Sequence, residues 1–252
     1  MYQGDKRTVP LSPLSLRQKE EGVLPETSKV SYLFVVITGI FISCLLISNM
    51  IAGKLITIGG IVLPGAVVLF PLAYIVGDVL TEVYGFARAR LVIWIGFLCN
   101  LLMVLAFYLV LVLPAPEFFA DGEAYALVLG MAPRVVLASL AAYWVGEFIN
   151  AIIMSRLKIL TRGRFLWVRT IGSSLVGQGL DTIIFITIVF WGTVGNNTLI
   201  QMIIYQYLFK ITYEILATPV TYAVTGWLKA REGMDIYDEG IRYNPFQLFK
   251  SR

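Results

Sequence analysis

The chain contains no histidine and only two cysteines, Cys44 and Cys99, which both lie in apolar runs. Histidine is the commonest metal ligand and carries protons near neutral pH, so its absence disfavours metal and acid–base chemistry. The two cysteines are interpreted as small packing residues and not as a disulfide. A glycine-rich phosphate loop and a nucleophile elbow are also missing. The sequence therefore predicts no metal site, no cofactor and no catalytic residue.

Charge is scarce as well. Only 14% of the 252 residues are charged, whereas 58% are hydrophobic. Soluble domains have about 25% charged and roughly 45–50% apolar residues. The composition predicts an all-α integral membrane protein whose partners include the surrounding lipid bilayer. The net charge of +4 gives no reason to expect nucleic acid as a partner.

Six segments are long and apolar enough to cross the bilayer, which takes about 20 residues. They are residues 30–52, 62–84, 89–113, 126–157, 166–192 and 198–228. These spans predict a transmembrane domain at 30–229. The polar residues 1–29 predict a disordered cytoplasmic arm, and residues 230–252 predict a cytoplasmic tail.

The basic residues indicate the orientation of these spans. Of the 20 basic residues, 17 lie in the arm, in or next to the connections after the second and fourth segments, or in the tail. The other three connections contain only Lys54, and residues 114–125 carry three acids. Cytoplasmic connections are enriched in Lys and Arg. Both termini are therefore expected in the cytoplasm, which requires an even number of spans.

Many polar residues lie inside the predicted spans, although a charge at the membrane centre costs roughly 2.5–3.5 kcal/mol. Such residues usually face a bundle interior or a water-filled cavity. The ionisable ones are Asp78, Glu82, Arg134, Glu147, Asp181, Lys210 and Glu214, and the amides are Asn49, Asn100, Asn150 and Gln178. A purely structural helix bundle would not need so many, so they predict a binding cavity.

Four of these residues lie near the middle of their spans. Gln178 and Asp181 share one helix face, and Lys210 and Glu214 share another, because residues three or four apart are neighbours on a helix. The second pair has an alternative interpretation as a neutralised pair that only fixes helix packing. The small residues of SSLVGQGLD, residues 173–181, are typical of close helix approach.

The other candidates are more peripheral. Glu147 and Asn150 share a face in the inner half of the fourth span, and Arg134 lies in its outer half. Asn100 is interpreted as a helix–helix hydrogen bond. The candidate substrate-binding residues are Gln178, Asp181, Lys210, Glu214, Glu147, Asn150, Asn49, Asp78, Arg134 and Tyr74.

The stretch GDVLTEVYG, residues 77–85, ends the second span with two carboxylates on one helix face. Asp78 is expected to face the interior. Glu82 is expected at the membrane interface near Arg88 and Arg90, with the inner end of a cavity as the alternative. Tyr74 precedes Asp78 by four residues, so an aromatic ring can adjoin a carboxylate.

The residue types restrict the solute. Acids outnumber bases in the spans, which disfavours an anion, and the absence of clustered His or Cys disfavours a soft metal ion. Carboxylates, amides and one lysine beside aromatic rings are typical of a site for a small planar molecule with donors and acceptors. A carboxylate accepts two N–H bonds from such a base, and Lys or Gln donates to its carbonyl.

Several motifs resemble the queuosine precursor transporter family, also called the vitamin-uptake-transporter-like family. They are SNMIAGKL (48–55), FPLAYIVGDVLTEVYG (70–85), RVVLASLAAYWVGEFINAIIMSRLK (134–158), RTIGSSLVGQGLDTIIF (169–185) and KITYEILATPVTY (210–222). The resemblance covers about residues 30–230. It implies a six-helix carrier in the bacterial inner membrane that imports 7-deazaguanine bases such as preQ0, preQ1 and queuine for tRNA modification. It also raises a homodimer as an expectation.

Two alternatives stay open from the residues. The first is a substrate-binding subunit of an ATP-driven vitamin importer, because Gly39 and Ser43 form a small-residue pair on the first span. The second is a membrane-embedded enzyme, which the missing histidine and nucleophile disfavour. For the carrier itself, buried carboxylates suggest proton coupling, and passive exchange is equally compatible.

Overall fold

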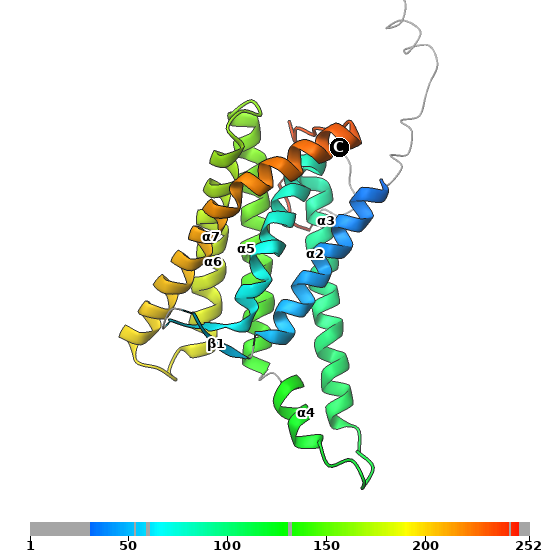
Figure 1. Cartoon of the computed structure of the whole chain (residues 1–252), viewed down its shortest axis with the longest axis vertical. Helices are drawn as coiled ribbons and strands as arrows, with labels where there is room; N and C mark the ends of the chain where they lie inside the picture. The colour runs from blue at the N-terminus through cyan, green and yellow to red at the C-terminus, as the bar shows by residue number, and fades with distance from the viewer. Residues whose placement is uncertain (1–30, 53, 59–60, 131–132, 242, 247–252) are drawn as a thin grey trace, which may run out of the picture.

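The computed structural model describes residues 31–52, 54–58, 61–130, 133–241 and 243–246 (Figure 1). The long helices are α2 (Tyr32–Ile51), α3 (Phe70–Val112), α5 (Pro133–Leu160), α6 (Leu166–Phe190) and α7 (Asn196–Glu232). The short elements are the antiparallel strands β1 (Leu55–Ile58) and β2 (Ile61–Pro64), the 3-10 helix η1 (Gly65–Val68) and helix α4 (Gly122–Leu129). The predicted disordered arm, residues 1–29, lies outside the described part of the chain.

The long helices place apolar side chains outward and polar ones inward. Over the described residues, four helical stretches are long and apolar enough to cross a membrane, namely residues 32–51, 70–112, 137–160 and 166–190. Leu102 on α3 and Leu137 on α5 are 68% and 65% exposed, whereas Asp78 and Arg169 are buried. A soluble protein would reverse this pattern. The chain is therefore a multi-pass, all-α membrane protein.

Helix α3 consists of two arms that meet at Gly85, where φ is 79° and ψ is 167°. Figure 1 shows the chain turning back between the cyan arm beside α5 and the arm that bears the α3 label. These dihedrals are essentially accessible only to glycine. The expected segments 62–84 and 89–113 therefore meet at one residue and are not separated by a loop.

Two predicted segment starts are wrong. Residues 62–68 form β2 and η1, and the helix begins at Phe70 with Pro71 in its first turn. Proline is tolerated there because the first N–H groups of a helix have no partner within it. The expected span 126–157 begins at Pro133, because residues 126–129 belong to α4. Hydropathy alone did not distinguish these short elements from helix.

The two ends of the bundle differ. Ser31 Oγ donates to the Glu232 carboxylate at 2.5 Å, which brings the start of α2 and the end of α7 together. Figure 1 shows this end at the top, with β1 and α4 at the other end. We call the first the tail end and the second the hairpin end.

Residues 233–241 and 243–246 pack against the tail end, beside the reversal at Gly85. The Phe86 N–H donates to Asp238 Oδ2 at 2.8 Å, and the Ile236 N–H donates to the Val83 carbonyl at 3.4 Å. Asp238 also accepts a bond from Ser155 Oγ at 2.5 Å. These bonds satisfy backbone groups that the interrupted helix leaves without partners, which matters most where water is scarce.

A buried ion cluster lies next to this reversal. The Glu82 carboxylate accepts two bonds from Arg169, at 3.0 and 2.8 Å, and one from Lys229 at 2.6 Å. Lys158 Nζ lies 3.6 Å from Glu82 Oε1. Glu82 and Arg169 are each only 1% exposed. The expected position of Glu82 near Arg88 and Arg90 at the interface is therefore wrong, because three other cations enclose it.

Asp235 extends the cluster from the tail. Its carboxylate lies 2.6 Å from Lys158 Nζ and 2.8 Å from Lys229 Nζ. Burial acts to raise the pKa of Asp235, but the hydrogen bonds from the two lysines outweigh it and lower that pKa below its ordinary value. Asp235 is therefore ionised at neutral pH, and it ties the tail to α5 and α7.

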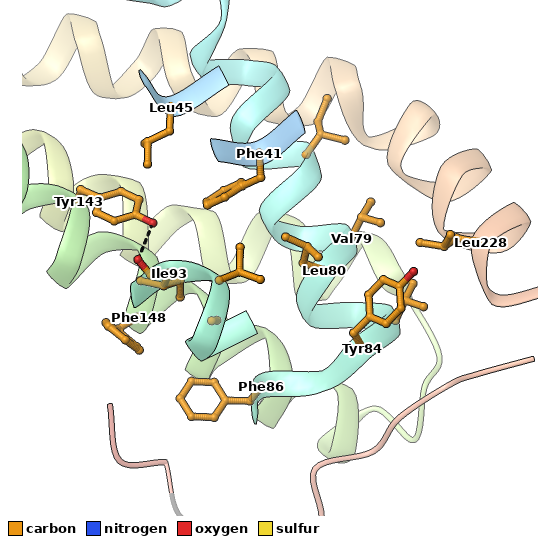
Figure 2. Close-up of a cluster of buried hydrophobic side chains, with 14 of the residues drawn as sticks. Phe41, Leu45, Val79, Leu80, Tyr84, Phe86, Ile93, Tyr143, Phe148 and Leu228 are labelled. Carbon is orange, nitrogen blue, oxygen red and sulfur yellow. Dashed lines mark hydrogen bonds between the residues drawn. The ribbon is translucent and has the colours of Figure 1, made fainter. Parts of the chain in front are cut away.

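Apolar packing joins α2, α3 and α5 at the same end. Figure 2 shows Phe41, Leu80 and Phe148 among the side chains of this cluster. The Tyr143 hydroxyl donates to the Ile93 carbonyl at 3.1 Å, so the second arm of α3 is bonded to α5 (Figure 2). The cluster leaves the polar residues of the central helices on its other side.

Gly85→Ala should destabilise the protein by about 1–3 kcal/mol, the usual cost of a residue forced into a disallowed backbone region. A Cβ there would also lie 2.8 Å from Ile236 Cγ2 and 2.9 Å from Asp238 Oδ1. Thermal unfolding in detergent measures the effect. Gly39→Ala is the matched control, because its Cβ would meet nothing within 4 Å. Equal melting temperatures for the two variants would contradict this account of the reversal.

Glu82→Gln should cost about 3–5 kcal/mol, because buried cations lose their counter-charge. Equilibrium unfolding in mixed detergent measures the change in free energy. Glu123→Gln, at an exposed position on α4, should leave the stability unchanged. Adding Arg169→Met to Glu82→Gln should recover part of the loss, since it removes the most deeply buried cation. A double variant no more stable than Glu82→Gln would argue against the ionic explanation.

Candidate functional site

The site forms where α5 and α6 cross at two glycines. A Cβ on Gly177 would lie 2.7 Å from Asn150 Cβ and 2.9 Å from the Gly146 carbonyl oxygen. A Cβ on Gly146 would lie 2.8 Å from Asp181 Cβ. Only residues without side chains allow the two backbones to approach this closely. The crossing places the polar residues that adjoin the glycines on both helices around one point.

A cavity of about 920 Å³ lies beside this crossing. Ligand pockets usually measure roughly 300–1,000 Å³. Helices α2 to α7 all contribute to its lining, and seven of the predicted site residues are part of it: Asn49, Tyr74, Glu147, Asn150, Gln178, Asp181 and Lys210. The structure therefore brings these seven residues together around one cavity.

The cavity reaches toward the hairpin end. Its lining includes Val128 on α4, Phe190 at the end of α6 and Thr198 at the start of α7. These elements lie opposite the tail in Figure 1. At the tail end, the Glu82 cluster and the packed tail fill the bundle. The structure thus has one end with a cavity and one that is closed.

One ion pair lies in the cavity wall. Lys210 Nζ lies 2.5 Å from Asp181 Oδ2. The ammonium also lies 5.6 Å from the ring centres of both Phe70 and Tyr74, within the range of a cation–π contact. The alternative in which Lys210 is neutralised by Glu214 is wrong, because the partner comes from α6. The pair presents a donor and an acceptor side by side.

The Gln178 amide on α6 lines the same cavity. Gln178 is only 3% exposed, and within the described part of the chain neither its nitrogen nor its oxygen has a hydrogen-bond partner. Asn150 Oδ1 also has no hydrogen-bond partner among the described residues. Buried polar groups normally have partners, since an unpaired one costs roughly 1–3 kcal/mol. These atoms therefore mark a place where a ligand or water binds.

Three predicted residues do not line the cavity. Asp78 is fully buried behind it, and its Oδ1 accepts a bond from Asn150 Nδ2 at 2.8 Å. Glu214 lies beside a second, smaller space next to Tyr74. Arg134 is in the first turn of α5, and its side chain lies outside the described part of the structure. The expected helix–helix bond of Asn100 is confirmed, because its Oδ1 accepts from Asn49 Nδ2.

Other lining residues were not predicted as site residues. Aromatic rings come from Phe70, Tyr143, Phe185, Phe190 and Tyr205, and polar groups from Ser139, Gln201 and Gln206. Spacing could have found four of them. Tyr143 precedes Glu147 by four residues, and Phe185 follows Asp181 by four. Phe70 precedes Tyr74 by four residues, and Gln206 precedes Lys210 by four, so each shares a helix face with a predicted residue.

The side chains of the cavity suit a planar ligand that has hydrogen-bond donors and acceptors. Asp181 and Glu147 accept hydrogen bonds, Lys210 donates, and the Gln178 amide does both. Aromatic rings around them supply flat surfaces for stacking. A single side of a heteroaromatic base carries N–H donors next to a carbonyl acceptor, which matches this arrangement.

Comparison with known proteins identifies the family. A protein-family model described as "Putative vitamin uptake transporter" matches residues 64–224. A "Probable queuosine precursor transporter" from Bacillus subtilis is 31% identical over 62% of this chain and 69% of its own length. A protein of the same description from Haemophilus influenzae is 27% identical over 62% of this chain and 65% of its own length. No solved structure gives a significant match.

The family match covers α3 to α6 and most of α7, which line the cavity together with α2. This chain belongs to the family described as "Putative vitamin uptake transporter" and is a membrane transporter.

Proposed function

We propose that this transporter imports queuosine precursors, 7-deazaguanine bases such as preQ0, preQ1 or queuine, across the bacterial inner membrane. The observation that carries the proposal is the Asp181–Lys210 pair beside the unsatisfied Gln178 amide in an aromatic-lined cavity. The names of the two relatives support the substrate class.

The deazaguanine ring has one edge that fits the pair. Lys210 donates to the ring carbonyl, and Asp181 accepts from the neighbouring ring N–H and amino group. Gln178 then satisfies its amide on the same edge. Phe70 and Tyr74, whose rings stack on each other with centroids 6.1 Å apart, provide a flat wall next to Lys210.

The orientation follows from the basic residues. Six crossings are formed by α2, the two arms of α3, α5, α6 and α7, with the tail end in the cytoplasm. Residues 1–29 and 230–252 then lie on the cytoplasmic side. The cavity opens to the outside, and the Glu82 cluster closes the inside. Import requires the ion pairs of this cluster to break, so that the cavity becomes accessible from each side of the membrane in turn.

A role as the binding subunit of an ATP-driven importer is the second candidate. Gly39 and Ser43 are both exposed on α2, where small residues would let a partner helix approach closely. Uptake by the purified chain alone in liposomes favours the carrier. Uptake that appears only after adding an ATP-hydrolysing partner favours the subunit.

The purified protein should show a thermal shift and calorimetric binding with at least one of preQ0, preQ1 and queuine, and less with adenine. Gln178→Ala and Asp181→Asn should weaken binding roughly tenfold or more, since a hydrogen bond to a charged group contributes about 1.5–3 kcal/mol. Asn197→Ala, an exposed amide outside the cavity lining, is the matched control. A folded protein that binds none of the bases would exclude the proposed substrate class.

Cysteine labelling tests the orientation. In a background with Cys44→Ala and Cys99→Ala, Gln201→Cys should react with a membrane-impermeant maleimide on intact cells, because residue 201 lines the outward cavity. Glu239→Cys, exposed in the tail, should react only after the cells are permeabilised. The reverse pattern would place the termini outside and the cavity inside.

A further inference from the structure

A second pair of acids lies one helical turn beyond the cavity wall. Lys210 on α7 contacts Tyr74 on α3, and both helices lead from there toward the tail end. Asp78 and Glu214 are each four residues further along, so they follow on the same two helix faces. Both side chains are buried where α3 packs against α7, and Glu214 lies beside the small space that Tyr74 lines. The two carboxyl groups therefore form one buried site between α3 and α7.

This acid pair is sealed from the cavity. Asp78 is 0% and Glu214 2% exposed, and neither lines the cavity. Asp78 Oδ2 and Glu214 Oε1 have no hydrogen-bond partner within the described part of the chain. Two unsatisfied acceptor atoms at one site indicate a missing donor.

The nearby cations form ion pairs with other acids. Lys210 is bonded to Asp181, and the three cations of the tail end surround Glu82. The other charged groups that act on Asp78 are also acids, Glu147 from α5 and Glu82 from its own helix. Gln178 from α6 is the polar group that faces Glu214. Among described residues, no base neutralises the pair.

Two buried carboxylates without a cation cannot both stay ionised at reasonable cost, because desolvation and mutual repulsion add. Binding of a single proton lowers both the desolvation cost and the repulsion between the two carboxylates. Protonation of either carboxyl gives the site an O–H donor and leaves the pair with one charge in place of two.

Each acid also adjoins an amide of the cavity wall. Asn150 lines the cavity and donates to Asp78, while Gln178 lines the cavity and faces Glu214. A ligand that engages these amides changes the hydrogen bonds available to the acids behind them. This connection links occupation of the cavity to protonation of the pair.

We propose that Asp78 and Glu214 bind one exchangeable proton that is co-transported with the substrate, a coupling site separate from the substrate cavity. The proposal rests on the proposed import function. The proton enters from the outward side, is shared between the two carboxyl groups during the conformational change, and leaves to the cytoplasm when the tail end opens. No covalent bond of the substrate changes.

Transport by proteoliposomes that contain the purified full chain tests the coupling. A pH gradient, acidic outside, should drive accumulation of preQ1 above equilibrium, and a dye inside should report proton entry with the substrate. Asp78→Asn and Glu214→Gln should lose accumulation and proton entry but retain gradient-free exchange of labelled for unlabelled preQ1. Glu117→Gln, exposed between α3 and α4, should behave like the wild type.

Accumulation that ignores the pH gradient, or follows sodium, would overturn the proposal, as would variants that still accumulate preQ1. Infrared spectroscopy separates this result from failure of the import function. The wild type should show the carbonyl stretch of a protonated carboxyl, lost in Asp78→Asn and in Glu214→Gln, without any substrate. Its absence would overturn the proton site even if transport of every 7-deazaguanine had also failed.

Discussion

A charge in the hydrocarbon region of a membrane has to be neutralised, and the helices of this protein are arranged around that requirement. Besides Glu147 in the cavity wall, the described residues form three acidic sites between the helices at successive depths. Asp181 is paired with Lys210 at the cavity wall, and Glu82 is enclosed by three cations at the tail end. Between them lie Asp78 and Glu214, which have no cation. The first site presents hydrogen-bonding groups to a ligand, the second closes the bundle, and the third needs a proton.

The closed end depends on glycine geometry and on the tail together. Gly85 reverses α3 within one residue, and residues of the tail satisfy backbone groups that this reversal leaves without partners. Asp235 and Asp238 connect the same tail to the ion cluster and to the reversal. The helix ends, the ion cluster and the tail are therefore joined as one unit at this end.

The cavity depends on a different pair of glycines. Gly146 and Gly177 let α5 and α6 approach at backbone distance, and the polar residues beside them then point to one place. A larger side chain at either position would separate the helices and move Glu147 and Gln178 apart. The substrate site is thus set by close packing, whereas the charges within it set what can bind.

The sequence by itself determined the membrane environment, the approximate spans and seven of the residues that line the cavity, because hydropathy and helical spacing are local properties. It could not place the start of α3 at Phe70, since an apolar stretch with prolines has the same hydropathy in a hairpin as in a helix. It also could not show that the two arms of α3 meet at Gly85. Only the tertiary structure decided the partners. Lys210 pairs with Asp181 and not with Glu214, and Glu82 with Arg169, because these contacts join helices far apart in the chain, and their distance depends on how the helices cross.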